Sequence, residues 1–263
     1  MKVVILCGGR GMRMNEETEF RPKPLVKIGH LPVLVHVMKI YAHWGYKDFI
    51  LCLGYRGEMI KDYFLNFDEH NNDFILEMGT RPKQISYVNK KSIIDDWRIT
   101  FADTGLGTNT GGRLARIKNL LAGEEDFFLT YADGVADINL PDVLRYHKSK
   151  KTVGTLCGVN YVNPFGIIKP KSGLVAVFKE KPRSSGYING GFYVFNKAIF
   201  KYVAPDENCV LEREPLQALS KKGQLSIYAH RGFWHCMDHM KHVEELNALY
   251  RSGDRSWMIW EPT

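Results

Sequence analysis

The chain has 263 residues, enough for one large domain or two small ones with a substantial buried core. Hydrophobic residues make up 44% and charged residues 25%, a globular composition that excludes intrinsic disorder, collagen-like repeats and a coiled coil. The 36 Lys and Arg against 29 Asp and Glu give a net charge of +7, which favours an anionic partner such as a phosphorylated metabolite, a nucleotide or a nucleic acid.

The five cysteines indicate a reducing compartment. Their number is odd and no two form a C-x-x-C pair, so we expect neither a disulfide framework nor a zinc knuckle. The apolar start of the chain reaches Gly8 well before the length of a signal peptide's core, and no later apolar run is long enough to span a membrane. We therefore expect a cytoplasmic protein with no membrane partner, whose folded part begins near Met1.

Short β-rich runs alternate with amphipathic helical stretches, which is typical of an α/β protein built on a mainly parallel sheet. A helix opens at Pro32, carries an apolar stripe through Tyr41 and ends before Gly45. Further helices are predicted at residues 56–67, 113–121, 214–221 and 239–251. Strands are predicted at residues 3–6, 49–53, 84–88, 99–101, 127–131, 153–159, 174–178, 193–195 and 225–228. No linker, repeat or low-complexity tract divides the chain, so a single domain over residues 1–263 is predicted, with a second half that elaborates the sheet.

A glycine-rich loop follows the first predicted strand, at residues 6–13 (LCGGRGMR). Its glycines let the backbone approach a ligand closely, and the following N–H groups with Arg13 can hold phosphate oxygens. The pattern is neither a P-loop nor G-x-G-x-x-G, because Met14 occupies the third glycine position. The second strand also ends without the acidic residue that binds ribose in a dinucleotide fold. An oxidoreductase and a P-loop NTPase are therefore disfavoured, and a tight turn without a ligand remains an alternative.

A rigid cationic arm is predicted at Lys23. Pro22 and Pro24 fix the backbone on either side, so the ammonium would lose little entropy on binding. Such an arm suits a triphosphate. A Lys-Pro dipeptide alone is more often part of a solvated loop, and the nearby glycine loop is what favours a functional interpretation.

Two acidic residues have the chemistry of a magnesium site. Asp133 follows a predicted buried strand at a turn, where a carboxylate can hold a hard cation against phosphate oxygens. Asp238, just before a predicted helix, would complete the pair if folding brings the two carboxylates together. An ordinary helix N-cap is the alternative for Asp238. Asp137 is interpreted as a turn or structural acid.

Three later segments offer groups for a nucleotide or a sugar phosphate, and each has a structural alternative. The amides of residues 110–113 and the Arg113 guanidinium could reach a base edge or a phosphate, or form a glycine-containing cap with a surface arginine. Glu180 and Lys181 could hold sugar hydroxyls and the sugar phosphate, or form a polar turn. The Asn189 amide beside two glycines could bind a hydroxyl, or belong to a tight turn.

The glycine loop, Arg13 and the Pro22-Lys23-Pro24 arm together resemble the signature of the sugar-1-phosphate nucleotidyltransferases. Further blocks extend the resemblance over nearly the entire chain, and they resemble the branch that transfers cytidylyl groups to glucose 1-phosphate. These blocks are residues 103–105 (DTG), 110–114 (TGGRL), 130–137 (TYADGVAD), 180–182 (EKP), 188–192 (INGGF), 232–234 (GFW), 237–238 (MD) and 257–261 (WMIWE). The chain departs from the usual family pattern at Met12, where many members carry threonine.

The resemblance implies a Rossmann-like, GT-A-like fold with a mainly parallel mixed sheet flanked by helices. It implies that CTP and α-D-glucose 1-phosphate give CDP-glucose and pyrophosphate, with Mg²⁺ as cofactor. The nucleotide would be bound by about residues 1–140, and the sugar phosphate by about residues 141–263, which would also form the oligomer. A cytoplasmic homo-oligomer, a trimer or hexamer, would feed deoxysugar and surface-polysaccharide synthesis such as lipopolysaccharide O-antigen.

The resemblance also implies the roles of individual residues. Arg13 and Lys23 would be catalytic, and Asp133 and Asp238 would hold the metal. The sugar phosphate would meet Glu180, Lys181, Asn189 and Gly190. The nucleotide would meet Leu6, Cys7, Gly8, Gly9, Arg10, Gly11, Met12, Arg13, Lys23, Thr108, Gly111, Arg113, Ala132 and Asp133.

Two alternatives remain open. The same chemistry could use UTP, dTTP or another hexose 1-phosphate, because cytosine differs from uracil mainly by one exchanged donor and acceptor. A catalytically silent protein that binds a nucleotide or RNA is compatible with the charge, but it would not need paired metal acids. The chain has no basic tail or aromatic RNA motif, so we expect no nucleic-acid partner.

A zinc site is not predicted near the second half's histidines, because the spacing of His235, His239 and His242 with Cys236 matches no standard set of zinc ligands.

Overall fold

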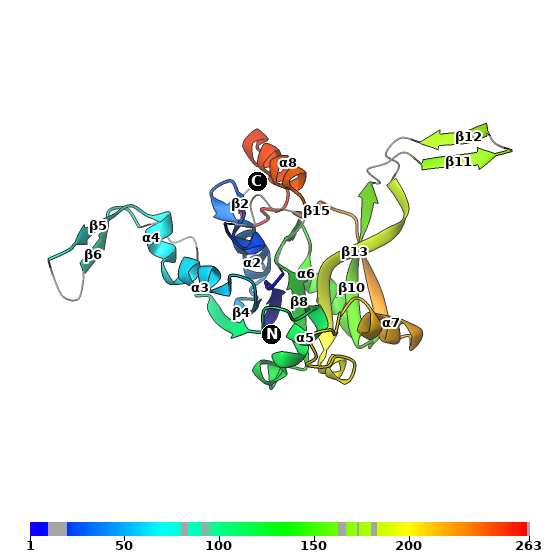
Figure 1. Cartoon of the computed structure of the whole chain (residues 1–263), viewed down its shortest axis with the longest axis horizontal. Coiled ribbons are helices and arrows are strands. Elements are labelled where there is room, and N and C mark those ends of the chain that lie inside the picture. Colours follow the sequence, from blue (N-terminus) through cyan, green and yellow to red (C-terminus); the bar gives the residue numbers. More distant parts are fainter. Residues whose placement is uncertain are drawn as a thin grey trace.

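The computed structural model describes residues 1–9, 20–79, 84–90, 94, 96–162, 167–172, 174–179 and 183–261. Its central sheet is built from β1 (Val3–Leu6), β4 (Asp48–Leu53), β7 (Arg98–Asp103), β8 (Asp126–Tyr131), β10 (Gly154–Val162), β13 (Arg183–Asn196) and β14 (Leu225–His230). These strands lie in the order β14-β10-β13-β8-β1-β4-β7 (Figure 1). β13 is antiparallel to both of its neighbours, and the other pairs are parallel. The predicted α/β fold with a mainly parallel mixed sheet is confirmed.

Helices cover both faces of this sheet. One face packs against α2 (Val33–His43), α3 (Gly57–Leu65), α6 (Leu140–Lys150) and α8 (Met240–Ser252). The other packs against α5 (Thr110–Arg116), α7 (Glu214–Lys221) and the 3-10 helices η3 (Lys118–Leu121) and η4 (Lys197–Lys201). Side chains alternate along β1, so Val3 and Ile5 join the first core and Val4 and Leu6 the second. β1 is therefore buried on both faces, as expected of a central parallel strand.

Four strand pairs lie outside the central sheet. They are β2 (Lys27–Ile28) with β3 (Leu31–Pro32), β5 (Phe74–Glu77) with β6 (Gln84–Tyr87), β9 (Gly134–Ala136) with β15 (Trp234–Cys236), and β11 (Ile167–Lys171) with β12 (Leu174–Lys179). Figure 1 shows the β5–β6 and β11–β12 pairs projecting from opposite sides of the molecule. Exposed apolar side chains on these two pairs are Phe74, Ile75, Leu76, Ile85, Leu174, Val175 and Val177.

The predicted strands are confirmed, but two predicted helices are each divided. The helix expected at residues 56–67 is α3 followed by α4 (Phe67–Asn71), with a break at Asn66, whose backbone and side-chain N–H groups both bond the carbonyl of Asp62. The helix expected at residues 113–121 is α5 followed by η3, and α5 begins earlier, at Thr110. A single helix in either place is wrong, because local side-chain bonds and the tighter 3-10 turn end the α-helical pattern.

Other elements are missing from the sequence prediction. α6 has clear signals, since Asn139 caps it by accepting from the Asp142 N–H, and Leu140, Val143 and His147 recur at helical spacing. β13 is much longer than the predicted residues 193–195, because Asn189 and its glycines form an irregularity inside the strand rather than a tight turn. No helix in the described parts of the chain is long and apolar enough to cross a lipid bilayer.

His36 anchors the C-terminal segment to α2. Its ring is fully buried, Nε2–H donates to the Ile28 carbonyl at 3.0 Å, and Nδ1 accepts from the indole N–H of Trp257 at 3.1 Å. Both contacts are satisfied by the neutral ring, and burial lowers the pKa of His36 to about 4. The contact between α2 and the chain end therefore depends on an uncharged histidine.

This burial predicts a stability that falls in mild acid. Between the ordinary histidine pKa of about 6.5 and the folded value of about 4, the unfolded chain binds a proton that the folded chain does not, so stability is lost as pH falls. His36→Gln keeps a donor and an acceptor but does not titrate. From pH 7 to pH 4.5 we expect the wild type to lose about 2 kcal/mol more unfolding free energy than this variant in urea titrations. Equal losses would contradict the neutral assignment of His36.

Candidate functional site

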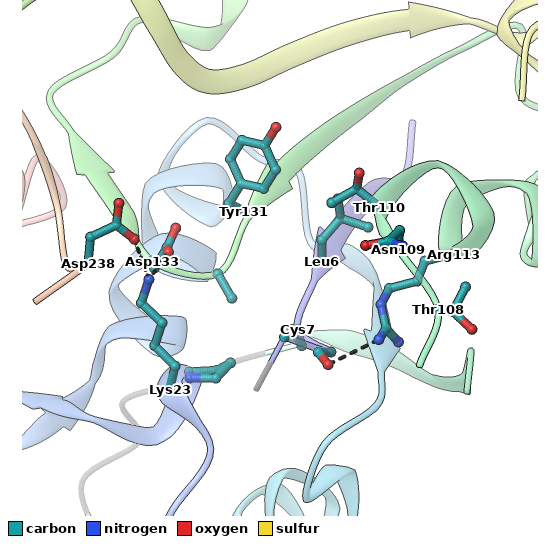
Figure 2. Close-up of a pocket in the computed structure, with 14 residues that line it drawn as sticks. Leu6, Cys7, Lys23, Thr108, Asn109, Thr110, Arg113, Tyr131, Asp133 and Asp238 are labelled. Atoms are coloured by element: carbon teal, nitrogen blue, oxygen red, sulfur yellow. Dashed lines mark hydrogen bonds and ion pairs between the residues drawn. The ribbon is translucent and has the colours of Figure 1, made fainter. Parts of the chain in front are cut away.

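A cavity of about 530 Å³ opens at the carboxyl ends of β1 and β8, the edge where parallel sheets place their ligands. The sequence-predicted residues that line it are Leu6, Cys7, Gly8, Gly9, Lys23, Thr108, Arg113, Ala132, Asp133 and Asp238. Figure 2 shows Lys23, Asp133 and Asp238 on one side, Thr108, Asn109 and Arg113 on the other, and Tyr131 between them. Residues far apart in the sequence thus meet at one cavity.

Pairing of β9 with β15 brings the two predicted metal acids together. Gly134 pairs with Cys236, and the next N–H along, that of Met237, donates to the carbonyl of Asp133 at 2.8 Å. Asp133 and Asp238 consequently lie at the same end of this strand pair. The helix N-cap considered for Asp238 is wrong, because His239 occupies the N-cap of α8 and no side chain caps it.

Lys23 lies between these carboxylates. Its ammonium donates to Oδ1 of Asp238 at 2.7 Å and to Oδ2 of Asp133 (Figure 2). The residue begins the 3-10 helix η2 (Lys23–Leu25), where Pro22 accepts from the Leu25 N–H at 2.8 Å. Burial alone lowers the pKa of Lys23, but the charges of Asp133 and Asp238 outweigh it and raise the pKa above its ordinary value. The lysine therefore stays charged and neutralises one of the two carboxylates.

The two carboxylates could hold a divalent metal ion together with a ligand. Their oxygens are hard donors of the kind that such cations take, usually alongside water and phosphate oxygens. Over the residues described in the structure, no group of three or more His, Cys, Asp and Glu side chains could hold an ion alone. Ligand oxygens would therefore have to complete the coordination between Asp133 and Asp238.

Arg113 is buried between two strand ends, so the surface arginine considered above is wrong. Its guanidinium donates to the Leu53 carbonyl at 2.8 Å, to Oγ1 of Thr104 at 2.7 Å and to the Gly8 carbonyl at 3.0 Å. A Cβ on Gly8 would lie 2.1 Å from the guanidinium carbon, and one on Gly54 would lie 2.6 Å from Nη1. Burial lowers the pKa of Arg113. Both glycines therefore make room for an arginine that joins the glycine loop to α5.

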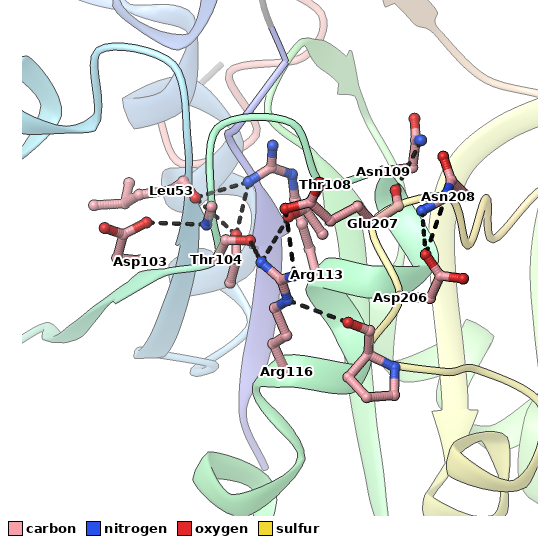
Figure 3. Close-up of polar contacts among 12 residues, drawn as sticks. Leu53, Asp103, Thr104, Thr108, Asn109, Arg113, Arg116, Asp206, Glu207 and Asn208 are labelled. Atoms are coloured by element: carbon pink, nitrogen blue, oxygen red, sulfur yellow. Dashed lines mark hydrogen bonds and ion pairs between the residues drawn. The ribbon is translucent and has the colours of Figure 1, made fainter.

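The loop before α5 is held both by α5 itself and by the second half of the chain. Figure 3 shows the contacts of Arg116, which donates to Oγ1 of Thr108 at 2.7 Å and to the Thr104 carbonyl at 2.8 Å. The backbone and side-chain N–H groups of Asn109 both donate to the Glu207 carbonyl at 2.9 Å. These contacts fix the wall of the cavity that Thr108 and Asn109 form.

Gly111 does not line the cavity. A Cβ there would lie 2.6 Å from Sγ of Cys209, so the residue packs against the segment before α7. The neighbouring Gly112 N–H donates to the Cys209 carbonyl at 3.0 Å and is already satisfied. This part of the predicted nucleotide segment contacts protein.

Asn189 and Gly190, two of the predicted sugar-phosphate residues, lie in β13. The Asn189 side chain donates through Nδ2 to the Tyr193 hydroxyl and accepts the Gly191 N–H through Oδ1 at 3.1 Å. Gly190 is buried, and its carbonyl accepts from the Trp234 indole at 2.8 Å. Neither residue lines the cavity. The remaining predicted site residues, Arg10, Gly11, Met12, Arg13, Glu180 and Lys181, lie outside the described residues.

Sequence reasoning assigned no role to Tyr131 or Glu212. The Tyr131 hydroxyl donates to Oε1 of Glu212, and the Thr110 hydroxyl donates to Oε2 at 2.6 Å. Tyr131 and Thr110 line the cavity, together with Pro24 and Asn109. A tyrosine at the end of a buried strand signals a hydroxyl that needs a partner, but the sequence does not reveal which distant residue supplies it.

Comparison with known proteins gives consistent matches. The nucleotidyl transferase family model matches residues 2–241. The chain is 43% identical to a Bacillus subtilis protein named "Probable glucose-1-phosphate cytidylyltransferase", over 99% of this chain and 100% of that protein. It is 38% identical to the glucose-1-phosphate cytidylyltransferase of Salmonella typhimurium, again over 99% and 100%. A solved Bacillus anthracis protein, titled "Putative Glucose-1-Phosphate Thymidylyltransferase", shares the fold with a TM-score of 0.66 at 17% identity, over 95% of each chain.

The buried position of Arg113 predicts a large loss of stability on substitution. Arg113→Met would leave the carbonyls of Leu53 and Gly8 without this donor in a buried place, so we expect unfolding free energy to fall by about 2–4 kcal/mol in urea titrations. Arg145→Met is the matched control. The Arg145 side chain is 76% exposed, and we expect its loss to change stability by less than about 0.5 kcal/mol. Similar losses in the two variants would contradict a structural role for Arg113.

Proposed function

Since the chain belongs to the nucleotidyl transferase family, we propose that it converts CTP and α-D-glucose 1-phosphate into CDP-glucose and pyrophosphate. The observation that carries the proposal is the Lys23 ammonium held between Asp133 and Asp238 at the cavity. This arrangement suits a highly charged phosphate chain, because it offers both a cation and a pair of metal-binding acids. The choice of cytosine and glucose rests on the names of the Bacillus subtilis and Salmonella typhimurium relatives, both of which are matched over their full length.

The chemistry requires no protein nucleophile. An oxygen of the sugar phosphate attacks the α-phosphorus of CTP in line, and the bond from that phosphorus to the oxygen that bridges the α- and β-phosphates breaks. The electron pair of the broken bond leaves with pyrophosphate. The attacking phosphate is already ionised, so no general base is needed. The protein contributes position and charge stabilisation.

Lys23 and Arg13 neutralise the charge that moves onto the leaving pyrophosphate in this proposal. Mg²⁺, held by Asp133 and Asp238 when bound, supplies further neutralisation of the phosphate oxygens. The two carboxylates are the hard oxygen donors that this ion prefers, and the described residues offer no third acidic, histidine or cysteine ligand beside them, so the ligand and water would fill the other positions. Lys23 contacts both acids, and an ion held between them would take its place and free its ammonium for a phosphate.

The substrates occupy two regions in this proposal. The nucleotide, in the part formed by about residues 1–140, contacts Leu6, Cys7, Gly8, Gly9, Arg10, Gly11, Met12, Arg13, Lys23, Thr108, Arg113, Ala132 and Asp133, whereas Gly111 packs against Cys209 outside the cavity. Open space beside Gly9 supports this placement, since a Cβ there would meet no atom of the described residues within 4 Å. The sugar phosphate contacts Glu180, Lys181, Asn189 and Gly190 in the part formed by about residues 141–263.

The protein acts as a homo-oligomer in this proposal, a trimer or hexamer. Exposed apolar residues on the two projecting pairs support it, including Ile75 at 60% and Leu174 at 75% exposure, because such patches on small strand pairs are usually covered. A cytoplasmic setting is supported by five free cysteines.

Pyrophosphate release tests the proposed function. Purified protein is given Mg²⁺ and glucose 1-phosphate with CTP, UTP, dTTP, GTP or ATP. We expect strong preference for CTP and CDP-glucose as product. Preference for another nucleotide would keep the reaction and overturn the base assignment. Absence of release with all five nucleotides and with other hexose 1-phosphates would overturn the enzymatic function.

Lys23→Ala removes the proposed neutralising charge. We expect turnover to fall by about 10²–10³, the usual scale for one positioned stabiliser of developing charge, with an unchanged circular dichroism spectrum. Lys27→Ala, in the neighbouring strand β2, is the control because its side chain is exposed, and it should leave turnover within about twofold. Near-normal turnover in Lys23→Ala would remove this residue from the mechanism.

Asp133→Asn replaces one proposed metal ligand with a weaker neutral one. We expect turnover at any Mg²⁺ concentration to be nearly abolished, because a neutral amide cannot replace the charge that holds the ion. Asp142→Asn, which breaks only an exposed pair with Arg145, is the control. An Mg²⁺ titration of Asp133→Asn that overlays the wild type would overturn the metal assignment.

A further inference from the structure

A continuous hydrogen-bond relay crosses the back of the cavity. It runs through Asn189, Tyr193, Tyr131, Glu212 and Thr110, and we call these five residues the relay. The Asn189 amide contacts the Tyr193 hydroxyl, which lies 3.0 Å from the Tyr131 hydroxyl. Tyr131 then contacts Oε1 of Glu212, and Thr110 contacts Oε2 at 2.6 Å. The relay therefore joins β13, β8, the segment before α7 and the start of α5.

The carboxylate of Glu212 gives the relay a fixed polarity. A carboxylate only accepts, so Tyr131 must donate its proton to Glu212. Tyr193 must then donate to the Tyr131 oxygen, and its own oxygen accepts from the amide of Asn189. Burial, with smaller contributions from neighbouring groups, raises the pKa of Tyr131 and of Tyr193, so both hydroxyls keep their protons. Each member is therefore oriented by the next.

Packing holds the relay in place. Tyr193 is fully buried, and the Tyr131 ring lies against Gly191, where a Cβ would come within 2.6 Å of it. Gly191 adopts a φ of 80°, which favours glycine, and its N–H donates to Oδ1 of Asn189 at 3.1 Å. The Asn189 amide is thus held at both ends. Among the described residues, these two contacts leave one N–H and one lone pair of the amide for a ligand.

The two ends of the relay lie at different proposed subsites. Thr110 and Tyr131 line the cavity proposed for the nucleotide, and Asn189 is a proposed ligand of the sugar phosphate. Glu212 has no hydrogen bond to Asn189 in the described structure, but its carboxylate sets the orientation of every donor between them. A substitution at Glu212 would therefore change the orientation of the Asn189 amide through Tyr131 and Tyr193.

We propose that Glu212 and Tyr193 are positioning residues that orient the Asn189 amide relative to the nucleotide wall and thereby set the affinity for the sugar phosphate. This inference rests on the proposed function, in which Asn189 binds the acceptor. Preorganisation of this kind lowers the entropy that the acceptor loses on binding, because the amide does not have to be fixed by the ligand.

Tyr193→Phe removes the central link with almost no change in volume. We expect the KM for glucose 1-phosphate to rise about tenfold, the scale of one lost hydrogen bond, with kcat and the KM for CTP within about twofold. Tyr228→Phe, on β14 and outside the relay, is the matched control and should leave all three values within about twofold. Glu212→Gln should raise the KM for both substrates. Glu212 accepts one hydrogen bond from the Tyr131 hydroxyl and one from the Thr110 hydroxyl, and the amide nitrogen of a glutamine could not accept the second of these.

A double-mutant cycle separates positioning from general damage. If Glu212 acts on the acceptor only through Asn189, adding Glu212→Gln to Asn189→Ala should raise the KM for glucose 1-phosphate no further. Asn189 is exposed, so this arm does not depend on the buried tyrosine. Additive effects, or an unchanged KM in Tyr193→Phe, would overturn the inference.

Direct binding distinguishes this inference from the proposed function. Calorimetry with glucose 1-phosphate measures acceptor affinity without turnover, and we expect the same order of loss as in KM. Binding that weakens in the relay variants while the wild type shows no turnover would overturn only the proposed reaction. Turnover in the wild type with unaltered binding in every relay variant would overturn only the relay.

Discussion

The contact of one ammonium with two carboxylates is the interaction on which the site depends. Asp133 and Asp238 are separated by 105 residues in the numbering (238 − 133) and meet because β9 pairs with β15. Two partly buried carboxylates at one place repel each other and are poorly solvated, so a cation must accompany them. Lys23 supplies it from a turn held by prolines. The same electrostatic need explains why this place would accept a divalent ion that arrives with a phosphate chain.

The opposite wall depends on a different constraint, the burial of Arg113. Its guanidinium satisfies carbonyls at the ends of two neighbouring strands, and the glycines at 8 and 54 leave the space that it fills. Asn109 and Thr110 are in turn fixed by the segment of residues 206–212. The second half of the chain therefore shapes the cavity even where it does not line it. A preformed wall is what charge stabilisation requires, because donors that must first reorganise stabilise a transition state less.

Local patterns predicted much of the fold and one half of the site. Strands such as β1 and β8 follow from short apolar runs, and Asp133 could be singled out because a carboxylate follows such a run. The divided helices at Asn66 and Ile117 could not be predicted from periodicity, because bonds to nearby carbonyls end them. The partnership of Tyr131 with Glu212 spans 81 residues and depends on tertiary placement. Arg113 shows the same limit, since its sequence neighbours do not reveal that Gly8 makes room for it.

Location of the metal in the substrate complex tests the central contact most directly. Crystals grown with CTP and Mn²⁺ in place of Mg²⁺ would reveal the ion by its anomalous scattering. We expect one peak beside the carboxylates of both Asp133 and Asp238 and the triphosphate, with the Lys23 ammonium moved from the carboxylates onto a phosphate. A peak away from both acids, or a lysine that still lies between them beside bound CTP, would contradict the exchange of Lys23 for a metal ion.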